Sequence, residues 1–217
     1  MERRVSAIAT LFGAKGSGSA AIEAALTLAG VPFRQVEGAT WEPGAGFDAL
    51  CQVNPLGQVP ALQTADGQVL TESAAILIAL GLAHPESGLL PADPALQAQS
   101  VRGLVYIAAN CYAMIGIIDY PERVCADCDE ALALRLRDGA RARLHDLWST
   151  FANGFVPAPW LGGATLGALD LLAAVVSRWS GARAHLAQHR PALLAHLQRV
   201  DADPRVAPVF QRHWPVP

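Results

Sequence analysis

The stretch Val59-Pro-Ala-Leu-Gln-Thr-Ala-Asp-Gly-Gln-Val-Leu-Thr-Glu-Ser73 decides the fold of the first part of this chain. It holds two short apolar runs on either side of an Asp-Gly pair, which is a strong hairpin signal. Residues 59–63 and 68–71 are therefore predicted to be adjacent antiparallel strands. Residues 73–83 follow as an apolar helix, and the serine at its start is the expected N-cap.

A strand, a helix and a second strand are predicted upstream of this hairpin. Residues 5–12 form an apolar run typical of a buried strand, and residues 33–37 are predicted to be the second strand. Residues 20–29 lie between them as a helix, with Ser19 as the expected N-cap. A strand–helix–strand unit implies a parallel pair of strands. A signal peptide is the alternative for the first residues, but the uninterrupted strand and helix signals favour the strand.

Residues 84–93 are rich in proline and are predicted to be a linker between two domains. The first domain is expected at residues 1–83 and the second at residues 94–217. The second domain has the periodicity of helices throughout. Its helices are predicted at residues 94–118, 127–151, 168–181, 183–189 and 191–201.

The composition excludes several classes of protein. Hydrophobic residues make up 52% of the 217, yet the longest apolar stretch, residues 104–118, is shorter than the roughly 20 residues of a membrane-spanning helix. The net charge is −3 and no basic run occurs, so neither a membrane nor a nucleic acid is an expected partner. The four cysteines lack the spacing of a secreted disulfide framework, which favours a reducing compartment such as the cytoplasm.

Two motifs carry a resemblance to a known family. They are Asn54-Pro-Leu-Gly-Gln-Val-Pro-Ala-Leu62 and Thr71-Glu-Ser-Ala-Ala-Ile-Leu77. At this spacing, after a strand–helix–strand unit and before a proline-rich linker, they resemble the glutathione-binding segment of the glutathione transferases. The resemblance covers nearly the whole chain. It implies an α/β thioredoxin-like N-terminal domain, followed by an all-α helical C-terminal domain, in a homodimer.

The same resemblance implies how glutathione binds. Val59 would offer its N–H and C=O to the cysteinyl unit, as a strand edge pairs with a peptide, and a cis Pro60 would turn these groups toward the ligand. Ser73 would receive the γ-glutamyl carboxylate at a helix N-terminus, and Glu72 would bind the amino group. Gln58 completes the predicted glutathione-binding set. The alternatives are an ordinary trans proline in an edge strand and a serine that only caps its helix.

The sequence departs from the family where the thiol of glutathione must be activated. A free thiol has a pKa of about 8.5 and is only slightly ionised at neutral pH. Family members place a Tyr, Ser or Cys in or just after the turn that follows the first strand. Here Gly13 stands at or next to the tyrosine place, and Gly18 aligns with the cysteine place.

The remaining polar side chains of this turn are the predicted catalytic residues. Ser17 is the first choice for the hydrogen bond to the thiol, and Ser19 is the second. The backbone N–H groups of the turn can act together with either. Lys15, the sole lysine of the chain, is predicted either to stabilise the thiolate or to bind the glycyl carboxylate. The alternative for Lys15 is a solvent-facing loop position.

Fewer signals come from the helical half. Tyr106 and Asn110 share one helix face at i, i+4, and the resemblance implies that this helix lines the pocket of the second substrate. The alternative is that Tyr106 lies in the core with its hydroxyl satisfied. The histidines at 185, 189 and 196 show no metal-ligand spacing and are expected on a solvated surface, so no metal is predicted. Cys125-Ala-Asp-Cys128 is expected to have no redox or zinc role.

The predicted function is conjugation of glutathione, as a co-substrate, to a small apolar electrophile. Two alternatives stay open on the sequence. One is glutathione-dependent reduction of disulfides or peroxides at the same site. The other is a non-catalytic binding or regulatory protein, because the turn lacks the tyrosine and the cysteine of the family.

Overall fold

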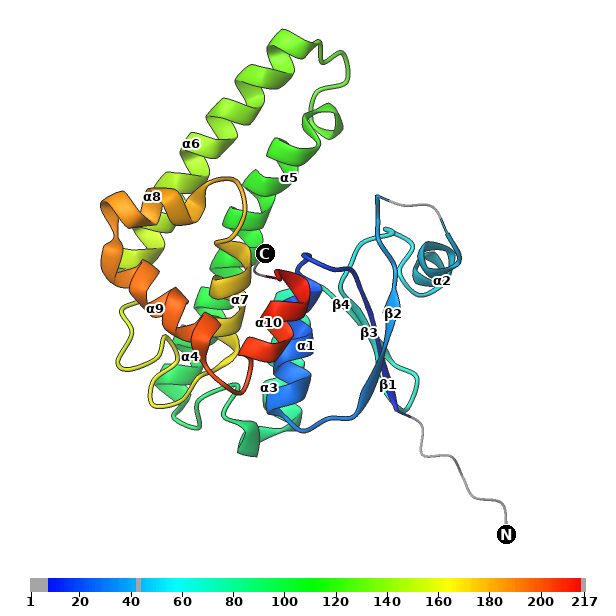
Figure 1. The fold of residues 1–217 in the computed structure, drawn as a ribbon, viewed down its shortest axis with the longest axis vertical. Coiled ribbons are helices and arrows are strands. Elements are labelled where there is room, and N and C mark those ends of the chain that lie inside the picture. Colours follow the sequence, from blue (N-terminus) through cyan, green and yellow to red (C-terminus); the bar gives the residue numbers. More distant parts are fainter. Residues whose placement is uncertain (1–7, 42–43, 216–217) are drawn as a thin grey trace.

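The computed structural model describes residues 8–41 and 44–215, and its first part is built on a four-stranded mixed sheet (Figure 1). The strand order is β2-β1-β3-β4. Strand β1 (Ala9–Gly13) is parallel to β2 (Phe33–Glu37) and antiparallel to β3 (Ala61–Gln63), and β3 is antiparallel to β4 (Val69–Thr71). The predicted parallel pair and the predicted hairpin are confirmed. Residues 5–7 of the predicted first strand lie outside the described residues.

Helices cover both faces of this sheet. Helices α1 (Ser19–Leu28) and α3 (Ser73–Ala83) lie on the face toward the helical half, and α2 (Ala45–Val53) lies on the opposite side (Figure 1). All of β1 is buried, because Leu11 belongs to the main core while Phe12 packs with Leu50 of α2. Burial on both faces explains why Leu11 and Phe12 are adjacent apolar residues and why β1 shows no strict alternation of apolar and polar residues.

Both predicted serine N-caps are wrong by one residue. The N-cap residues are Gly18 for α1 and Glu72 for α3, so Ser19 and Ser73 are the first residues of their helices. The Ser19 hydroxyl accepts a hydrogen bond from the Ala14 N–H and donates one to the Ala14 carbonyl, both at 3.2 Å. Because this hydroxyl closes the turn between β1 and α1, it is not available to cap the helix.

The second part of the chain is helical, as predicted. A short 3-10 turn, η1 (Pro85–Ser87), lies in the predicted linker. Helix α4 (Pro94–Tyr106) continues through a π-helical turn, η2 (Ile107–Tyr112), into α5 (Ala113–Asp119). The remaining elements are η3 (Pro121–Arg123), α6 (Glu130–Gly154), α7 (Ala168–Val176), α8 (Ala182–His189), α9 (Pro191–Ala202) and α10 (Ala207–His213). Helix α10 lies beyond the last predicted helix and packs beside α1 (Figure 1).

Helix α7 is buried along its whole length and contacts α1, α3, α4 and α9. The buried Asp170 carboxylate accepts hydrogen bonds from the Gly167 N–H at 3.0 Å and the Leu161 N–H at 2.9 Å, and it lies 2.7 Å from His196 Nε2. His196 is 5% exposed, so the expectation that it lies on a solvated surface is wrong. One core crosses between the two halves, and the division into domains at residues 83 and 94 stays a prediction.

The continuous helical segment Pro94–Asp119 is, among the described residues, the single candidate for a membrane span by length and composition. An 18-residue window within this segment has a mean hydropathy of 1.6. A core helix passes the same test, and this segment packs against α6 and α7.

Candidate active site

A cavity of about 560 Å³ lies between the sheet and the helical half. One wall comes from the turn after β1, the loop between α2 and β3, and the start of α3. The other wall comes from η2, α5, η3 and Trp179. This volume is typical of small-molecule sites, which are often found where two parts of a fold meet.

The structure brings the five predicted glutathione-binding residues together on one wall of this cavity. Gln58, Val59 and Pro60 come from the loop before β3, and Glu72 and Ser73 come from the start of α3. The Val59–Pro60 peptide bond is cis, as expected from the resemblance. Two segments that are separated by the β3–β4 hairpin therefore present backbone and side-chain polar groups to the same space.

Asn54 organises the loop that presents Val59. Its side-chain Nδ2 donates to the Gln58 carbonyl at 2.8 Å, and its Oδ1 accepts from the Leu56 N–H at 3.3 Å. Asn54 is buried and also lines the cavity. The sequence analysis gave no role to this residue, although an asparagine that begins an Asn-Pro-Leu-Gly segment is a known turn signal.

Glu72 has an unusual backbone conformation. Its φ is 65° and its ψ is 113°, and positive φ is uncommon for a residue with a side chain. The conformation occurs where β4 ends and α3 begins, so that Glu72 and the first turn of α3 both border the cavity. Backbone strain of this kind gathers at ligand-binding and active sites.

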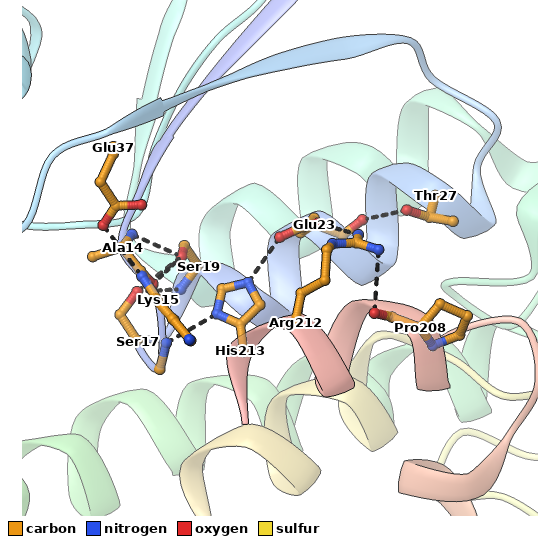
Figure 2. A network of polar contacts seen from close by, with 11 residues as sticks. Ala14, Lys15, Ser17, Ser19, Glu23, Thr27, Glu37, Pro208, Arg212 and His213 are labelled. Atoms are coloured by element: carbon orange, nitrogen blue, oxygen red, sulfur yellow. Dashed lines mark hydrogen bonds and ion pairs between the residues drawn. The ribbon is translucent and has the colours of Figure 1, made fainter. Parts of the chain in front are cut away.

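The predicted catalytic side chains of the turn after β1 do not line the cavity. Ser17 and Ser19 are buried and their hydroxyl oxygens are 2.8 Å apart, while the Ser19 N–H donates to Ser17 Oγ at 3.2 Å (Figure 2). Lys15 lies at a separate hollow of about 140 Å³, beside Glu37 and Arg212. Gly16 is the residue of this turn that reaches the main cavity.

Helix α10 is hydrogen-bonded to the turn after β1. The Gly16 N–H donates to His213 Nδ1 at 3.1 Å, and His213 Nε2 lies 2.8 Å from Glu23 Oε2 (Figure 2). Because a backbone N–H occupies Nδ1, the ring proton is on Nε2 and is donated to Glu23. Arg212 binds the other Glu23 oxygen. No sequence motif predicts this network, because it joins residues from opposite ends of the chain.

Glu23 is a buried carboxylate that is nevertheless stabilised in its charged form. Burial alone raises its pKa, but the hydrogen bonds from His213 and Arg212, together with the charge of Arg212, lower the pKa below its ordinary value. The pair of partners therefore compensates the desolvation of Glu23. This network connects α10 to α1 and to the pocket-lining Gly16.

Tyr106 and Asn110 do not line the cavity. The Tyr106 hydroxyl donates to the Leu147 carbonyl at 2.9 Å, and its ring packs against Phe151 with ring centroids 5.9 Å apart. Asn110 Nδ2 donates to the Tyr106 carbonyl at 3.1 Å. Tyr106 thus has the core position that was the alternative for it. The residues of this helix that line the cavity include Ala108, Tyr112 and Ile115, which the sequence analysis did not single out.

Residues 19–82 match the family described as "Glutathione S-transferase, N-terminal domain". The structure is also similar to a crystal structure of a glutathione transferase from Methylococcus capsulatus, with 29% identity and a TM-score of 0.73, over 96% of this chain and 100% of that one. Residues 19–82 therefore match a glutathione transferase domain, and the chain as a whole has the fold of a glutathione transferase.

Two other proteins are similar to this chain, one in sequence and one in fold. The "Uncharacterized GST-like protein YncG" of Escherichia coli K12 is 35% identical over 123 residues, which are 56% of this chain. The match spans 60% of the length of that relative. A glutathione transferase homologue from Sulfitobacter, solved with bound glutathione, has 23% identity and a TM-score of 0.80, over 94% of this chain and 97% of that one. The second likeness is one of fold.

Gly13 and Gly18 stand at or next to the two turn positions where the resemblance implies a thiol-activating side chain. The space beside Gly13 is filled, because a Cβ there would lie 2.6 Å from Ser19 Oγ. All four cysteines are free, and none lines the cavity. Among the described residues there is no group of three or more His, Cys, Asp or Glu side chains that could hold a metal.

Proposed function

We propose that this protein binds glutathione in the cavity between the sheet and the helical half, and conjugates its thiolate to a small apolar electrophile. The observation that carries the proposal is the convergence of Gln58, Val59, Pro60, Glu72 and Ser73 on one wall. These residues come from two segments, and together they offer a strand edge, a carboxylate and a helix N-terminus. Each of these groups complements a different part of a tripeptide.

The backbone of Val59 pairs with the cysteinyl unit of glutathione, in the manner of an added strand. Ser73 and the first N–H groups of α3 bind the γ-glutamyl carboxylate, because a helix N-terminus carries a partial positive charge. The Glu72 carboxylate binds the γ-glutamyl amino group. The Glu72 side chain does not cap α3, so it is not committed to the helix.

The second substrate binds against the helical wall. Ala108 and Ile115 supply apolar surface, and the Trp179 ring faces the same cavity. Arg123 stacks on the Tyr120 ring, with the guanidinium carbon 3.8 Å from the ring centroid, so a cation borders the apolar surface. We propose that this wall, rather than Tyr106 and Asn110, selects the electrophile.

Reduction through a mixed disulfide with the protein itself is disfavoured, because no protein thiol lines the cavity. A reductase that works through a mixed disulfide needs a cysteine next to the glutathione sulfur. Cys111 directly precedes the cavity-lining Tyr112 but is buried in the core, and Cys125 and Cys128 precede α6 in the helical half; none of the three borders the cavity.

Steady-state turnover tests the reaction class. The purified protein is assayed with glutathione and a panel of electrophiles, disulfides and peroxides. The proposal predicts turnover with electrophiles, and loss of this turnover in Ser73→Ala. Turnover confined to disulfides or peroxides would contradict conjugation. Tight glutathione binding without turnover of any class would instead favour a binding or regulatory role.

A further inference from the structure

The backbone conformation at position 18 does not require a glycine. Gly18 has φ −61° and ψ −17°, which is right-handed helical geometry open to any residue. What excludes a side chain is Tyr112. A Cβ at Gly18 would lie 2.2 Å from Tyr112 Oη and 3.4 Å from Tyr112 Cζ. The Tyr112 hydroxyl therefore fills the space into which a side chain of residue 18 would project.

This hydroxyl lies where two helices begin. The same Cβ at Gly18 would lie 3.5 Å from Ser73 Oγ. Gly18 is the N-cap of α1, and Ser73 is the first residue of α3, so both helix N-termini are next to Tyr112 Oη. Tyr112 and Ser73 both line the cavity. Two positive helix ends favour an anion at this point, and a phenol beside them can donate a hydrogen bond to that anion.

Two features of the helical half position the Tyr112 ring. Tyr112 is the last residue of the π-helical turn η2, and such turns insert an extra residue that changes the direction of the side chains that follow. The Tyr112 ring packs against Trp179, with centroids 5.8 Å apart. Tyr106, six residues earlier, donates its hydroxyl hydrogen bond to the Leu147 carbonyl. The π-helical turn thus separates a structural tyrosine from one that faces the cavity.

We infer that Tyr112 is the catalytic residue that contacts the glutathione sulfur, and that it replaces, from the helical half, the side chain missing at position 18. The inference rests on the proposed function. In the reaction, the thiol releases its proton to solvent, and the Tyr112 hydroxyl donates a hydrogen bond to the thiolate. The sulfur electron pair then forms the bond to the electrophile, and the leaving group departs with its own electron pair.

Tyr112 acts as a hydrogen-bond donor and not as a base. Burial raises the pKa of its phenol well above the ordinary value, the Glu72 carboxylate raises it further, and the Ser73 hydroxyl opposes the rise. The phenol therefore keeps its proton at neutral pH. A protonated hydroxyl held beside the sulfur stabilises the thiolate relative to the thiol, which lowers the pKa of glutathione.

Ultraviolet titration of bound glutathione tests the inference in wild type and Tyr112→Phe. In wild type the bound thiol should have a pKa below the value of about 8.5 for a free thiol. Tyr112→Phe should raise that pKa by about one unit, which is a tenfold change in ionisation. Its glutathione affinity at about pH 5.5, where the thiol is protonated, should stay within roughly threefold of wild type.

The geometry is tested separately, without glutathione. Gly18→Ala should lower Tm by about 2–10 °C when Tyr112 is present, because the new methyl group overlaps Tyr112 Oη. In the Tyr112→Phe background the same substitution should lower Tm much less, since the remaining ring carbon is 3.4 Å away. In the Tyr112→Phe background, Gly18→Cys should also fold. Its thiol would then place a side chain of residue 18 next to the glutathione sulfur.

The outcomes separate the two claims. No glutathione binding by wild type would overturn the proposed function, and this inference with it. Binding with a depressed thiol pKa that Tyr112→Phe leaves unchanged would overturn the inference alone. Tighter binding by Tyr112→Phe with an unchanged thiol pKa would also overturn it, because the hydroxyl would then only occupy the site. Equal loss of Tm from Gly18→Ala in both backgrounds would contradict the geometry.

Discussion

The Ser17 hydroxyl serves the turn between β1 and α1 and not the cavity. It accepts from the Ser19 N–H at 3.2 Å and lies 2.8 Å from Ser19 Oγ. Ser17→Ala removes a hydrogen-bond partner from both the N–H and the hydroxyl of the buried Ser19. It should therefore lower the free energy of unfolding by about 0.5–1.5 kcal/mol. The exposed Lys15 is the matched control, and Lys15→Ala should change stability by less than about 0.5 kcal/mol.

Urea unfolding of both variants measures these effects, and the thiol titration described above measures their effect on glutathione. We expect Ser17→Ala to change the pKa of the bound thiol less than Tyr112→Phe does. A larger effect of Ser17→Ala would return the catalytic role to the serine, as the sequence alone predicts.

Single residues also show how far the sequence predicts the site. The wall of the cavity that is proposed to bind glutathione was predictable, because Gln58, Val59 and Pro60 form one local motif and Glu72 and Ser73 form another. Each motif is set by its own loop or helix start. Tyr112 was not predictable, because its neighbour Gly18 lies on another element far away in the sequence.

At the scale of elements, helix α4 shows where periodicity fails. A regular helix across residues 94–118 places Tyr106 and Asn110 on one face, and this led to the wrong pair for the cavity wall. The residues that reach the cavity, Ala108, Tyr112 and Ile115, also recur at helical spacing, but they lie on another face of this segment, which contains the π-helical turn η2. No local signal in the sequence marks a π-helical turn here.

The contact of α10 with α1 predicts a dependence of stability on acid. The folded-state pKa of Glu23 is lowered, although burial opposes the shift, so ionised Glu23 stabilises the fold. This stabilisation is complete above the unfolded-state pKa of about 4.3 and is lost as the pH falls through the lower folded-state value. Wild type should therefore lose more stability than Glu23→Gln when the pH falls below about 4.3.

Urea unfolding at a series of pH values compares the two proteins. At neutral pH Glu23→Gln should be less stable than wild type, since His213 and Arg212 lose a charged partner. The difference between the two curves should shrink in acid. A difference that stays constant from pH 7 downward would show that the charge of Glu23 does not contribute.

At the scale of the whole molecule, exposed apolar side chains predict a homodimer, in agreement with what is expected from the family. Val105 on α4 is 50% exposed and Leu134 on α6 is 56% exposed. Contact with a second copy would bury these side chains. Sedimentation velocity should show a dimer at micromolar concentration, and Val105→Glu with Leu134→Glu should shift it to the monomer.

Val156→Glu is the matched control, because Val156 is also exposed but lies in the loop after α6. It should leave the dimer intact. A wild-type protein that sediments as a monomer at micromolar concentration would refute the prediction.

The overall architecture was largely predictable from the sequence. The Asp-Gly hairpin, the apolar helices and the proline-rich segment at residues 84–93 are local signals, and they predict the order of elements. Helix α10 was not predicted, and the burial of His196 depends on Asp170, which lies on a different helix. Contacts between elements that are distant in the sequence leave no periodic pattern to detect.

Calorimetric titration of glutathione tests the central claim most directly. Wild type should bind glutathione with a measurable affinity, and Glu72→Gln and Ser73→Ala should each weaken binding about tenfold or more, since the first removes the negative charge that pairs with the amino group and the second removes a hydrogen bond to a carboxylate. Glu86→Gln should bind like wild type, because Glu86 is exposed and lies outside the cavity. The absence of binding heat from wild type at millimolar glutathione would contradict the account.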